Sequence, residues 1–233
     1  MPIISDVDQQ FLRDHFAKTL TGDVTIIHFT QHQSKLILPG PECTFCKETR
    51  ELLEELAHLS DKIHLELHDF VKEAELAGQL GVDKIPGTVL QGVNKGAVRY
   101  FGVPSGYEFA GLIEDIVDLS RGTVDLSQET RAALSALEED VHLQVFVTPT
   151  CPYCPTVARL AHKMAMESAR VQADVVEITE FPYLSQRFNV SGVPKTIING
   201  KAEIPGALPE ARFLQRILQA VQPRQADTTP GAR

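Results

Sequence analysis

Thr148-Pro149-Thr150-Cys151-Pro152-Tyr153-Cys154 is the stretch that decides the fold of this chain. It follows the apolar run 145–147 and precedes a helical pattern of apolar residues. The start of a helix exposes unpaired N–H groups and the positive end of the helix dipole, which together stabilise a thiolate. A thiolate held there attacks disulfides near neutral pH. Two cysteines separated by two residues at this junction therefore indicate dithiol–disulfide chemistry.

The two cysteines are expected to have different roles. Cys151 lies near the helix N-cap, and Pro152 is expected at the first helical position, where its missing N–H costs nothing. The N–H groups of Tyr153 and Cys154 then face the Cys151 sulfur. We expect Cys151 to be the attacking thiolate and Cys154 the buried resolving thiol. The alternative is a static disulfide or a pair of inert buried thiols.

The same pattern occurs a second time in the chain. Cys43 and Cys46 have the same spacing, and Cys43 lies 108 positions before Cys151. Pro86 also lies 108 positions before Pro194, so each first cysteine is followed by a proline 43 positions on. An internal repeat of this kind indicates two similar folded units.

The two copies differ just before their cysteines. Twelve residues separate Thr30 from Cys43, whereas two separate Thr148 from Cys151. The first copy therefore carries an insertion of about ten residues, 31–41.

Apolar periodicity predicts the same order of elements in each half, α-β-α-β-α-β-β-α. The first helix, capped by Ser5 or Asp6, is expected to bury one apolar face formed by Val7, Phe11, Leu12 and Phe16. Helices are expected at about 5–20, 72–80, 127–139, 183–188 and 210–221. Apolar residues at helical spacing predict three more, one after each cysteine pair and one before the domain boundary, marked by Leu52, Leu53, Leu56 and Leu59, by Val157, Leu160, Ala161 and Met164, and by Phe109, Leu112, Ile113, Ile116 and Val117. Strands are expected at 24–29, 63–70, 97–101, 141–147, 174–178 and 202–204, and within 81–90 and 192–200.

Each half is expected to form one small mixed sheet. A β-α-β unit needs a crossover helix and gives parallel strands, whereas the final strand pair is an antiparallel hairpin. We expect an α/β fold with two tandem four-stranded units, each flanked by helices on both faces. This pattern, with Cys-x-x-Cys after the first core strand and Pro before the third, is similar to the thioredoxin fold.

The resemblance narrows to one family. Two fused units and the run Phe146-Val147-Thr148-Pro149-Thr150-Cys151-Pro152-Tyr153-Cys154-Pro155 resemble the glutaredoxin-like protein disulfide oxidoreductases of thermophilic archaea and bacteria. Ile4-Ser5-Asp6, Arg99-Tyr100-Phe101-Gly102, Phe109 and Glu114-Asp115-Ile116-Val117-Asp118 support it. It covers the chain except for the C-terminal tail and the 31–41 insertion, which is not part of the family pattern.

The resemblance also assigns roles to two prolines. Pro86 and Pro194 resemble the cis-proline of the thioredoxin fold, which places each beside its own cysteine pair. The backbones of Ile85 and Val193 would then bind an extended substrate, because the proline has no N–H that competes. The alternative is a pair of ordinary trans turn prolines.

Domain boundaries are expected at 1–122 and 123–222, divided at Arg121-Gly122-Thr123. Residues 223–233 are polar, contain Pro and Gly, and are expected to be a disordered tail.

The two cysteine pairs are not expected to be equal. Cys43 and Cys46 enclose Thr44-Phe45 and have no proline between them. The charge of Glu42 opposes a thiolate at Cys43, whereas that of Lys47 favours one. By the same geometry Cys43 attacks and Cys46 resolves, and the alternative is a structural disulfide or a weaker auxiliary redox site.

Other titratable residues are expected to contribute less. Thioredoxins proper carry a buried acid on the strand before the motif, and 145–147 contains none. Asp69 and Glu177, at equivalent positions on the neighbouring strand, are interpreted as ordinary strand-end carboxylates; the alternative is that they replace that acid. His28, His32 and His142 are expected to have no redox role. Lys47 and Lys195 are expected to be solvated charges, and the alternative is that they tune the pKa of a thiolate.

Composition excludes several classes of protein. The net charge of −9 argues against nucleic-acid binding and against anionic membrane surfaces, and no apolar run reaches the roughly 20 residues of a membrane span. The N-terminus has no basic segment followed by a long apolar one, so we expect no signal peptide and a cytoplasmic location. Four cysteines in such a chain favour catalysis or metal binding. Zinc is the less favoured use, because 104 residues separate Cys46 from Cys151, so no metal is expected.

The expected activity is thiol–disulfide exchange on protein disulfides through a mixed disulfide, mainly at Cys151, with no bound cofactor. The resemblance implies that electrons come from an NADPH-dependent flavoenzyme of the thioredoxin-reductase type or from small thiols. An alternative is a dedicated electron carrier to a peroxiredoxin, since tandem thioredoxin folds also resemble the N-terminal module of alkyl hydroperoxide reductase flavoproteins. Those modules typically keep only one cysteine pair, whereas this chain has two. A third is a non-enzymatic scaffold that binds unfolded chains.

Overall fold

The computed structural model describes residues 2–31 and 43–221. The predicted 31–41 insertion, apart from Gln31, lies outside these residues, as do the predicted 223–233 tail, Glu42 and His32.

Within residues 2–31 and 43–122, the first half contains four helices and four strands in the expected order. Ser5 caps the first helix, because its Oγ accepts a hydrogen bond from the Asp8 N–H at 3.2 Å. Gly122 ends the last helix in the left-handed conformation that glycine adopts readily (φ 67°). The elements are α1 (Asp6–Thr19), β1 (Val24–Thr30), α2 (Cys46–Ala57), β2 (Ile63–Asp69), α3 (Ala74–Gln79), β3 (Gly87–Gln91), β4 (Ala97–Phe101) and α4 (Tyr107–Arg121).

The second half repeats this order. Ser127 caps its first helix by accepting a hydrogen bond from the Thr130 N–H at 3.1 Å. That helix ends at Ser135, four residues earlier than expected. The elements are α5 (Gln128–Ser135), β5 (Val141–Val147), α6 (Cys154–Glu167), β6 (Val171–Glu177), α7 (Pro182–Arg187), β7 (Lys195–Ile198), β8 (Ala202–Pro205) and α8 (Glu210–Val221).

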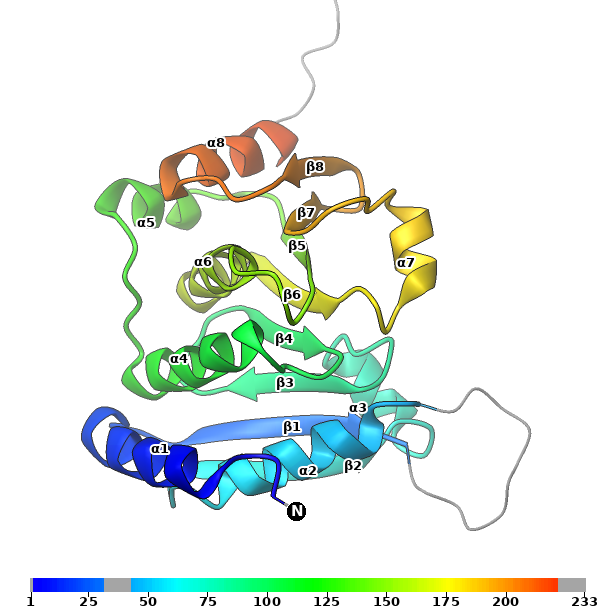
Figure 1. The fold of residues 1–233 in the computed structure, drawn as a ribbon. Coiled ribbons are helices and arrows are strands. Elements are labelled where there is room, and N and C mark those ends of the chain that lie inside the picture. Colours follow the sequence, from blue (N-terminus) through cyan, green and yellow to red (C-terminus); the bar gives the residue numbers. More distant parts are fainter. Residues whose placement is uncertain (1, 32–42, 222–233) are drawn as a thin grey trace, which may run out of the picture.

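The eight strands form one continuous mixed sheet, in the order β2-β1-β3-β4-β6-β5-β7-β8 (Figure 1). The two thioredoxin-like units and their α/β class are confirmed, but their sheets join edge to edge, which the sequence did not indicate. The joint is the parallel pair β4–β6, where Ala97 lies opposite Gln172 and Phe101 opposite Val176. Each half thereby covers the exposed edge strand of the other.

Helices cover the two faces of the sheet unequally. Among the described residues, one large apolar cluster includes residues of α1, α2, α4, α5, α6 and α8 and runs through both halves. A smaller cluster on the other face packs α3 and α7 against the sheet. The domain boundary predicted between residues 122 and 123 stays a prediction. The large apolar cluster contains residues from both sides of it, so the packing does not mark a division at this point.

The predicted apolar face of α1 is only half correct. Leu12 and Phe16 are buried, with 5% and 1% of their surface exposed. Val7 and Phe11 are 79% and 67% exposed, because α1 lies at the edge of the molecule and turns only one side toward the core (Figure 1).

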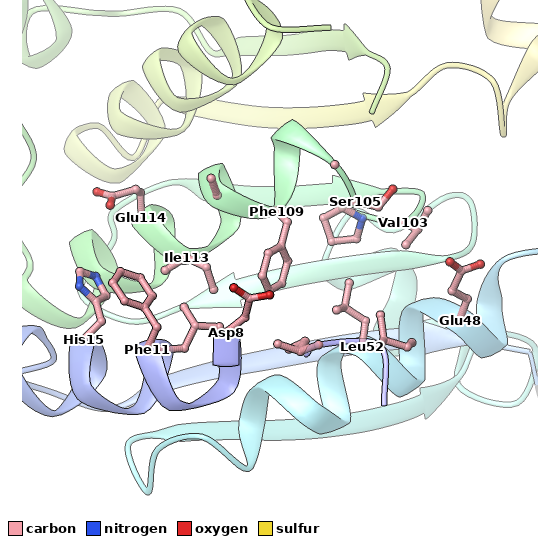
Figure 2. A pocket seen from close by; sticks show the side chains of 16 residues that line it. Asp8, Phe11, His15, Glu48, Leu52, Val103, Ser105, Phe109, Ile113 and Glu114 are labelled. Carbon is pink, nitrogen blue, oxygen red and sulfur yellow. The ribbon is translucent and has the colours of Figure 1, made fainter. Parts of the chain in front are cut away.

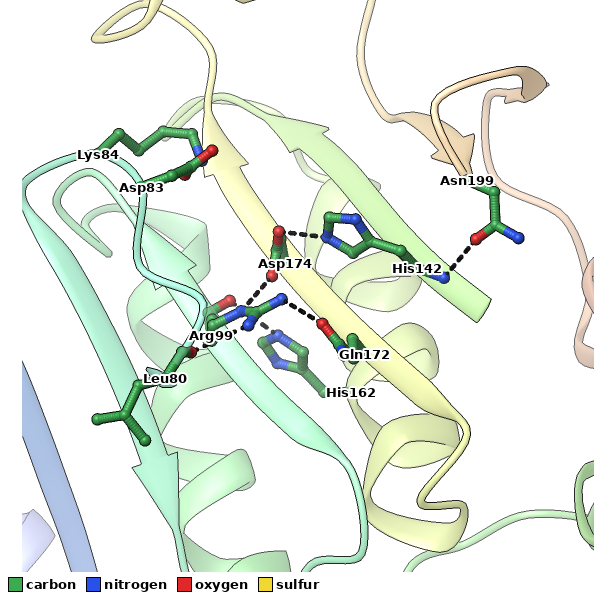
Figure 3. Close-up of polar contacts among 9 residues, drawn as sticks. All are labelled: Leu80, Asp83, Lys84, Arg99, His142, His162, Gln172, Asp174 and Asn199. Carbon is green, nitrogen blue, oxygen red and sulfur yellow. Dashed lines mark hydrogen bonds and ion pairs between the residues drawn. The ribbon is translucent and has the colours of Figure 1, made fainter. Parts of the chain in front are cut away.

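Buried polar contacts join the two halves on one side of the joint. The Arg99 guanidinium on β4 donates a 2.6 Å hydrogen bond to Asp174 on β6, and the other Asp174 oxygen accepts one from His142 at 2.6 Å (Figure 3). Arg99 also donates to Gln172 at 3.0 Å. Burial alone would raise the pKa of Asp174, but hydrogen bonding to His142 and the charge of Arg99 hold it below its ordinary value.

A second polar cluster lies between α4 and α6. Asp115 is fully buried and accepts hydrogen bonds from the Tyr100 hydroxyl and from His162 Nδ1, both at 2.6 Å. It also forms an ion pair with Arg159. Because Tyr100 and Asp115 belong to the first half and Arg159 and His162 to the second, the halves share one polar core.

Candidate active sites

Both cysteine pairs lie at the same edge of the sheet. Strands β1, β2, β4, β5 and β6 all run in one direction, as their pairings show. The C-terminal ends of parallel strands meet at one edge, and each cysteine pair follows such an end, β1 for the first and β5 for the second. Helices α2 and α6 begin at Cys46 and Cys154.

The second pair is a disulfide with little exposed surface. Cys151 and Cys154 have a Cα–Cα distance of 5.5 Å and are 8% and 0% exposed. The expectation for Pro152 is wrong by two residues: α6 begins at Cys154, so Pro152 lies in the turn before it and Pro155 occupies the first turn of the helix. The turn is closed by the Cys154 N–H donating to the Cys151 carbonyl at 3.4 Å.

The first pair has similar geometry but different surroundings. Cys43 and Cys46 are disulfide-bonded with a Cα–Cα distance of 5.4 Å; Cys43 is half-buried and Cys46 is buried. The Cys43 N–H donates to the Gln31 side chain at 2.8 Å. The first turn of α2 carries an acid, Glu48, whereas that of α6 carries none. A carboxylate near a helix start offsets the positive field that a thiolate needs.

The two prolines occupy matching places beside these pairs. The Ile85–Pro86 and Val193–Pro194 bonds are both cis, as the resemblance implied. Both prolines are buried, whereas Ile85 and Val193 keep part of their surface exposed. Each proline directly precedes a strand that pairs with the end of the cysteine-bearing strand, β3 with β1 and β7 with β5. Their proposed contact with substrate stays a prediction.

Asp69 and Glu177 close the turns after their strands. Asp69 Oδ1 accepts hydrogen bonds from the N–H groups of residues 71 and 72 at 3.1 and 2.9 Å. Glu177 accepts them from the N–H groups of residues 179 and 180 at 3.3 and 2.9 Å. Both carboxylates thus form equivalent turn contacts in the two halves, in line with their interpretation as strand-end groups.

Lys195 is not the solvated charge that was expected. It is 8% exposed, and its Nζ donates to the carbonyls of Phe188 and Asn189 at 3.0 and 3.1 Å. It therefore binds the C-terminal end of α7, where a cation is favoured. Lys47 is exposed and pairs with Glu51 at 3.7 Å.

Sequence reasoning underestimated His28. It belongs to β1 and is fully buried, with Nδ1 3.0 Å from the Thr88 hydroxyl. Burial lowers its pKa to about 3, so the imidazole is neutral at physiological pH. Thr30 pairs with Asp69 in the first half, and Val147 pairs with the equivalent residue Glu177 in the second half, so Thr30 and Val147 occupy equivalent positions. Two residues earlier, His28 is equivalent to Val145. A polar side chain therefore stands in the first half where the second has an apolar one.

Glu108 was missed altogether. It lies in the first turn of α4, where an acid normally indicates only a helix start, yet it is 2% exposed and neither carboxyl oxygen has a hydrogen-bond partner. Burial, with a contribution from the charge of Asp115, raises its pKa to about 8. The preceding residue, Tyr107, donates its N–H to the Pro149 carbonyl at 3.0 Å, so Glu108 lies beside the loop that leads to Cys151.

Glu108→Gln is expected to change how stability depends on pH. An acid with a raised pKa loses its proton first in the unfolded chain, so the wild type should lose stability from about pH 4.5 to pH 8, by on the order of a few kcal/mol. Denaturant unfolding at pH 5 and pH 8 should show this loss in the wild type and a smaller loss in Glu108→Gln. The exposed neighbour Glu114→Gln serves as control, and equal pH dependence in all three proteins would refute the assignment.

The fold and the two disulfides define a class: a protein disulfide oxidoreductase with two thioredoxin domains. Each domain places one Cys-x-x-Cys pair at the start of a helix, at the strand edge described above. Sequence comparison agrees, because the thioredoxin domain family matches residues 34–114 and 141–219. The chain belongs to this family.

Solved structures of similar proteins include a protein disulfide oxidoreductase from Aeropyrum pernix K1, with 26% identity, a TM-score of 0.83 and 93% coverage of both chains. The F component of alkyl hydroperoxide reductase from Enterococcus faecalis matches with 25% identity and a TM-score of 0.78, covering 91% of this chain and 98% of that one. Among curated sequences, the F component of alkyl hydroperoxide reductase from Xanthomonas campestris is 25% identical over 155 residues, 66% of this chain. The chain spans 28% of the length of that relative.

Among residues 2–31 and 43–221, no helix combines the length and the apolar character that crossing a bilayer requires.

Proposed function

We propose that this chain exchanges thiols and disulfides with protein substrates through a mixed disulfide. The observation that carries the proposal is the pair of Cys-x-x-Cys disulfides at one sheet edge, each with its second cysteine starting a helix. In each pair the first cysteine is the more exposed, which supports Cys151 and Cys43 as attacking groups and Cys154 and Cys46 as resolving groups.

The exchange starts from the reduced dithiol. The Cys151 thiolate attacks one sulfur of a substrate disulfide; a Cys151–substrate bond forms, the substrate S–S bond breaks, and the departing substrate sulfur takes up a proton. Cys154 then loses its proton and attacks the Cys151 sulfur, which forms the Cys151–Cys154 disulfide and releases the second substrate thiol. Two electrons pass to the substrate. In the other direction, the same steps oxidise it.

Substrate backbone is proposed to bind beside the prolines. The half-exposed Ile85 and Val193 stand next to the ends of the cysteine-bearing strands and offer free backbone groups to an extended chain. The adjacent Pro86 and Pro194 have no N–H that could compete.

We propose that the Cys151/Cys154 pair does most of the work. Its helix starts without an acid in the first turn, whereas Glu48 reduces the positive field at the start of α2. Glu108 follows Tyr107, whose N–H donates to the Pro149 carbonyl in the loop before Cys151, and we propose that this buried acid exchanges protons with the pair. The Cys43/Cys46 pair then acts in parallel or relays electrons.

The proposed electron donor is an NADPH-dependent flavoenzyme of the thioredoxin-reductase type. A specific alternative is that the chain carries electrons to a peroxiredoxin, which its similarity to the F component of alkyl hydroperoxide reductase favours. A reconstituted assay with reductase, this chain and a peroxiredoxin distinguishes the two. Peroxide consumption that depends on this chain, without comparable insulin reduction, would favour the carrier.

Replacing all four cysteines by serine tests the redox proposal itself. The variant is expected to lose insulin reduction completely, because no sulfur remains to form the mixed disulfide. A light-scattering assay of chaperone activity on a cysteine-free client serves as the parallel measurement. If the variant without cysteines suppresses aggregation of the client as well as the wild type does, while it reduces no insulin, a non-enzymatic scaffold would be favoured.

A further inference from the structure

An apolar groove runs between α1, α2 and α4, and none of its lining residues is a cysteine. Its volume is ≈ 540 Å³, which is large enough for several side chains of a bound segment. The apolar part of its lining includes Ile3, Phe11, Leu52, Phe109 and Ile113. We call it the α1–α4 groove.

The groove begins close to the first cysteine pair. Helix α2 starts at Cys46, and the α2 residues that line the groove are Glu48, in its first turn, and Leu52, one turn on. Figure 2 shows Glu48 at one end of the groove and His15 and Glu114 toward the other, with Phe109 and Ile113 between them. A chain that reacts at Cys43 could therefore continue into the groove.

The groove leaves large apolar side chains exposed, although the Phe11 ring stacks on that of His15 with 6.1 Å between the ring centroids. Phe11 is 67% exposed and Ile3 is 42% exposed, and both line the groove. Exposed apolar side chains gathered in a groove with a polar rim form a candidate interaction site. This also gives a reason why the predicted inward face of α1 is not buried at Phe11.

The charged residues of the groove have one sign. Asp8, Glu48 and Glu114 line it, and within the described part of the chain the other titratable lining residue is His15. Figure 2 shows the three carboxylates spread along the groove rather than gathered at one point. Lys or Arg side chains on a bound segment would meet a complementary charge at each of these places.

We propose that the α1–α4 groove binds a segment of a protein substrate that carries apolar side chains flanked by Lys or Arg, and thereby directs the substrate's disulfide to Cys43. The proposal rests on the proposed function and deepens it. It gives the first site a substrate preference that the second site, whose residues do not line the groove, does not share. A second copy of this chain is the other occupant that the tests distinguish.

The binding test uses the full oxidised chain and fluorescent peptides without cysteine, so that it does not depend on redox activity. One peptide carries Leu and Phe flanked by Lys, and its twin carries Glu in place of Lys. The Lys peptide is expected to bind, with binding weakened about tenfold in Phe11→Ser and in Glu114→Lys. Val7→Ser is the matched control on the same helix, because Val7 is 79% exposed but does not line the groove.

The activity test uses a chain with Cys151 and Cys154 replaced by serine. Phe11→Ser is expected to raise the KM for a disulfide-linked Lys peptide about tenfold with little change in kcat. Equal binding of both peptides would overturn the proposal, and so would equal binding by Phe11→Ser and the wild type. A wild-type dimer at micromolar concentration that is monomeric in Phe11→Ser would also overturn it, because a second copy would then occupy the groove. Peptide binding without disulfide exchange in the chain that lacks Cys151 and Cys154 would refute the delivery of substrate to Cys43 and leave peptide binding by the groove standing. Peptide binding without disulfide exchange in the wild type would refute the proposed function.

Discussion

Cys151→Ser is expected to lower the rate of insulin reduction by at least about tenfold, whereas Cys43→Ser should lower it by less than about twofold. Serine cannot form the thiolate that attacks the substrate disulfide, so each variant removes one site. The difference follows from the helix starts: α6 has no acid in its first turn, and α2 has Glu48 there.

Two controls make this ranking testable. Glu48→Gln removes the opposing charge at the first site and is expected to raise the activity of a chain that retains only Cys43 and Cys46 toward a small disulfide, which does not occupy the groove that Glu48 lines. The same substitution should leave a chain that retains only Cys151 and Cys154 unchanged. Equal losses from Cys151→Ser and Cys43→Ser would refute the unequal division of work.

Asp115→Ala is expected to have the largest effect on stability, a loss of about 3–5 kcal/mol. Asp115 is fully buried, and its removal leaves the Arg159 cation and the hydrogen-bonding groups of Tyr100 and His162 without their shared partner. Urea unfolding monitored by circular dichroism measures the loss. Glu114→Ala, an exposed acid on the same helix, is the control and should change stability by less than about 0.5 kcal/mol.

The loss of stability in Asp115→Ala should also depend on pH. Burial would raise its pKa, but the charges of His162 and Arg159 outweigh burial and hold the pKa below the ordinary value of 3.8. A carboxyl with a depressed pKa stabilises the fold fully above its unfolded pKa, and this contribution is lost as pH falls through the folded pKa. The difference between wild type and Asp115→Ala should therefore persist at pH 5 and shrink below pH 3.8. A difference that is the same at pH 3 and pH 7 would contradict the ion-pair explanation.

The repeat of cysteines and prolines was sufficient to predict two thioredoxin units, because strand, turn and helix signals are local. The joint between the sheets was not predictable in this way. Arg99 and Asp174 are 75 residues apart and belong to different halves, and nothing in a strand's own pattern shows which foreign edge it will pair with. The exposure of Val7 and Phe11 has the same origin, since helical periodicity shows that a face is apolar but not whether anything covers it.

The sequence predicted the spacing of the cysteine pairs and the prolines beside them. It predicted less well the start of the helix at the second pair and the buried titratable residues nearby. Pro152 was placed in the helix because helix starts are uncertain by one or two residues when only the sequence is known. Glu108 looked like an ordinary first-turn acid, and its burial depends on how α4 packs against the rest of the molecule, including the contact of Tyr107 with Pro149, which the pattern of α4 alone does not show. His28 was set aside because a histidine within a β-branched strand has no local signal of a polar partner such as Thr88.

The central claim is that the chain works through a mixed disulfide formed mainly at Cys151. The most direct measurement is mass spectrometry of the Cys154→Ser variant after reduction and mixing with insulin, beside the matched Cys46→Ser variant. We expect Cys154→Ser to accumulate a covalent adduct joined through Cys151, since the resolving thiol is gone, and Cys46→Ser to accumulate less. No adduct in Cys154→Ser, or more adduct at Cys43 in Cys46→Ser, would contradict the account.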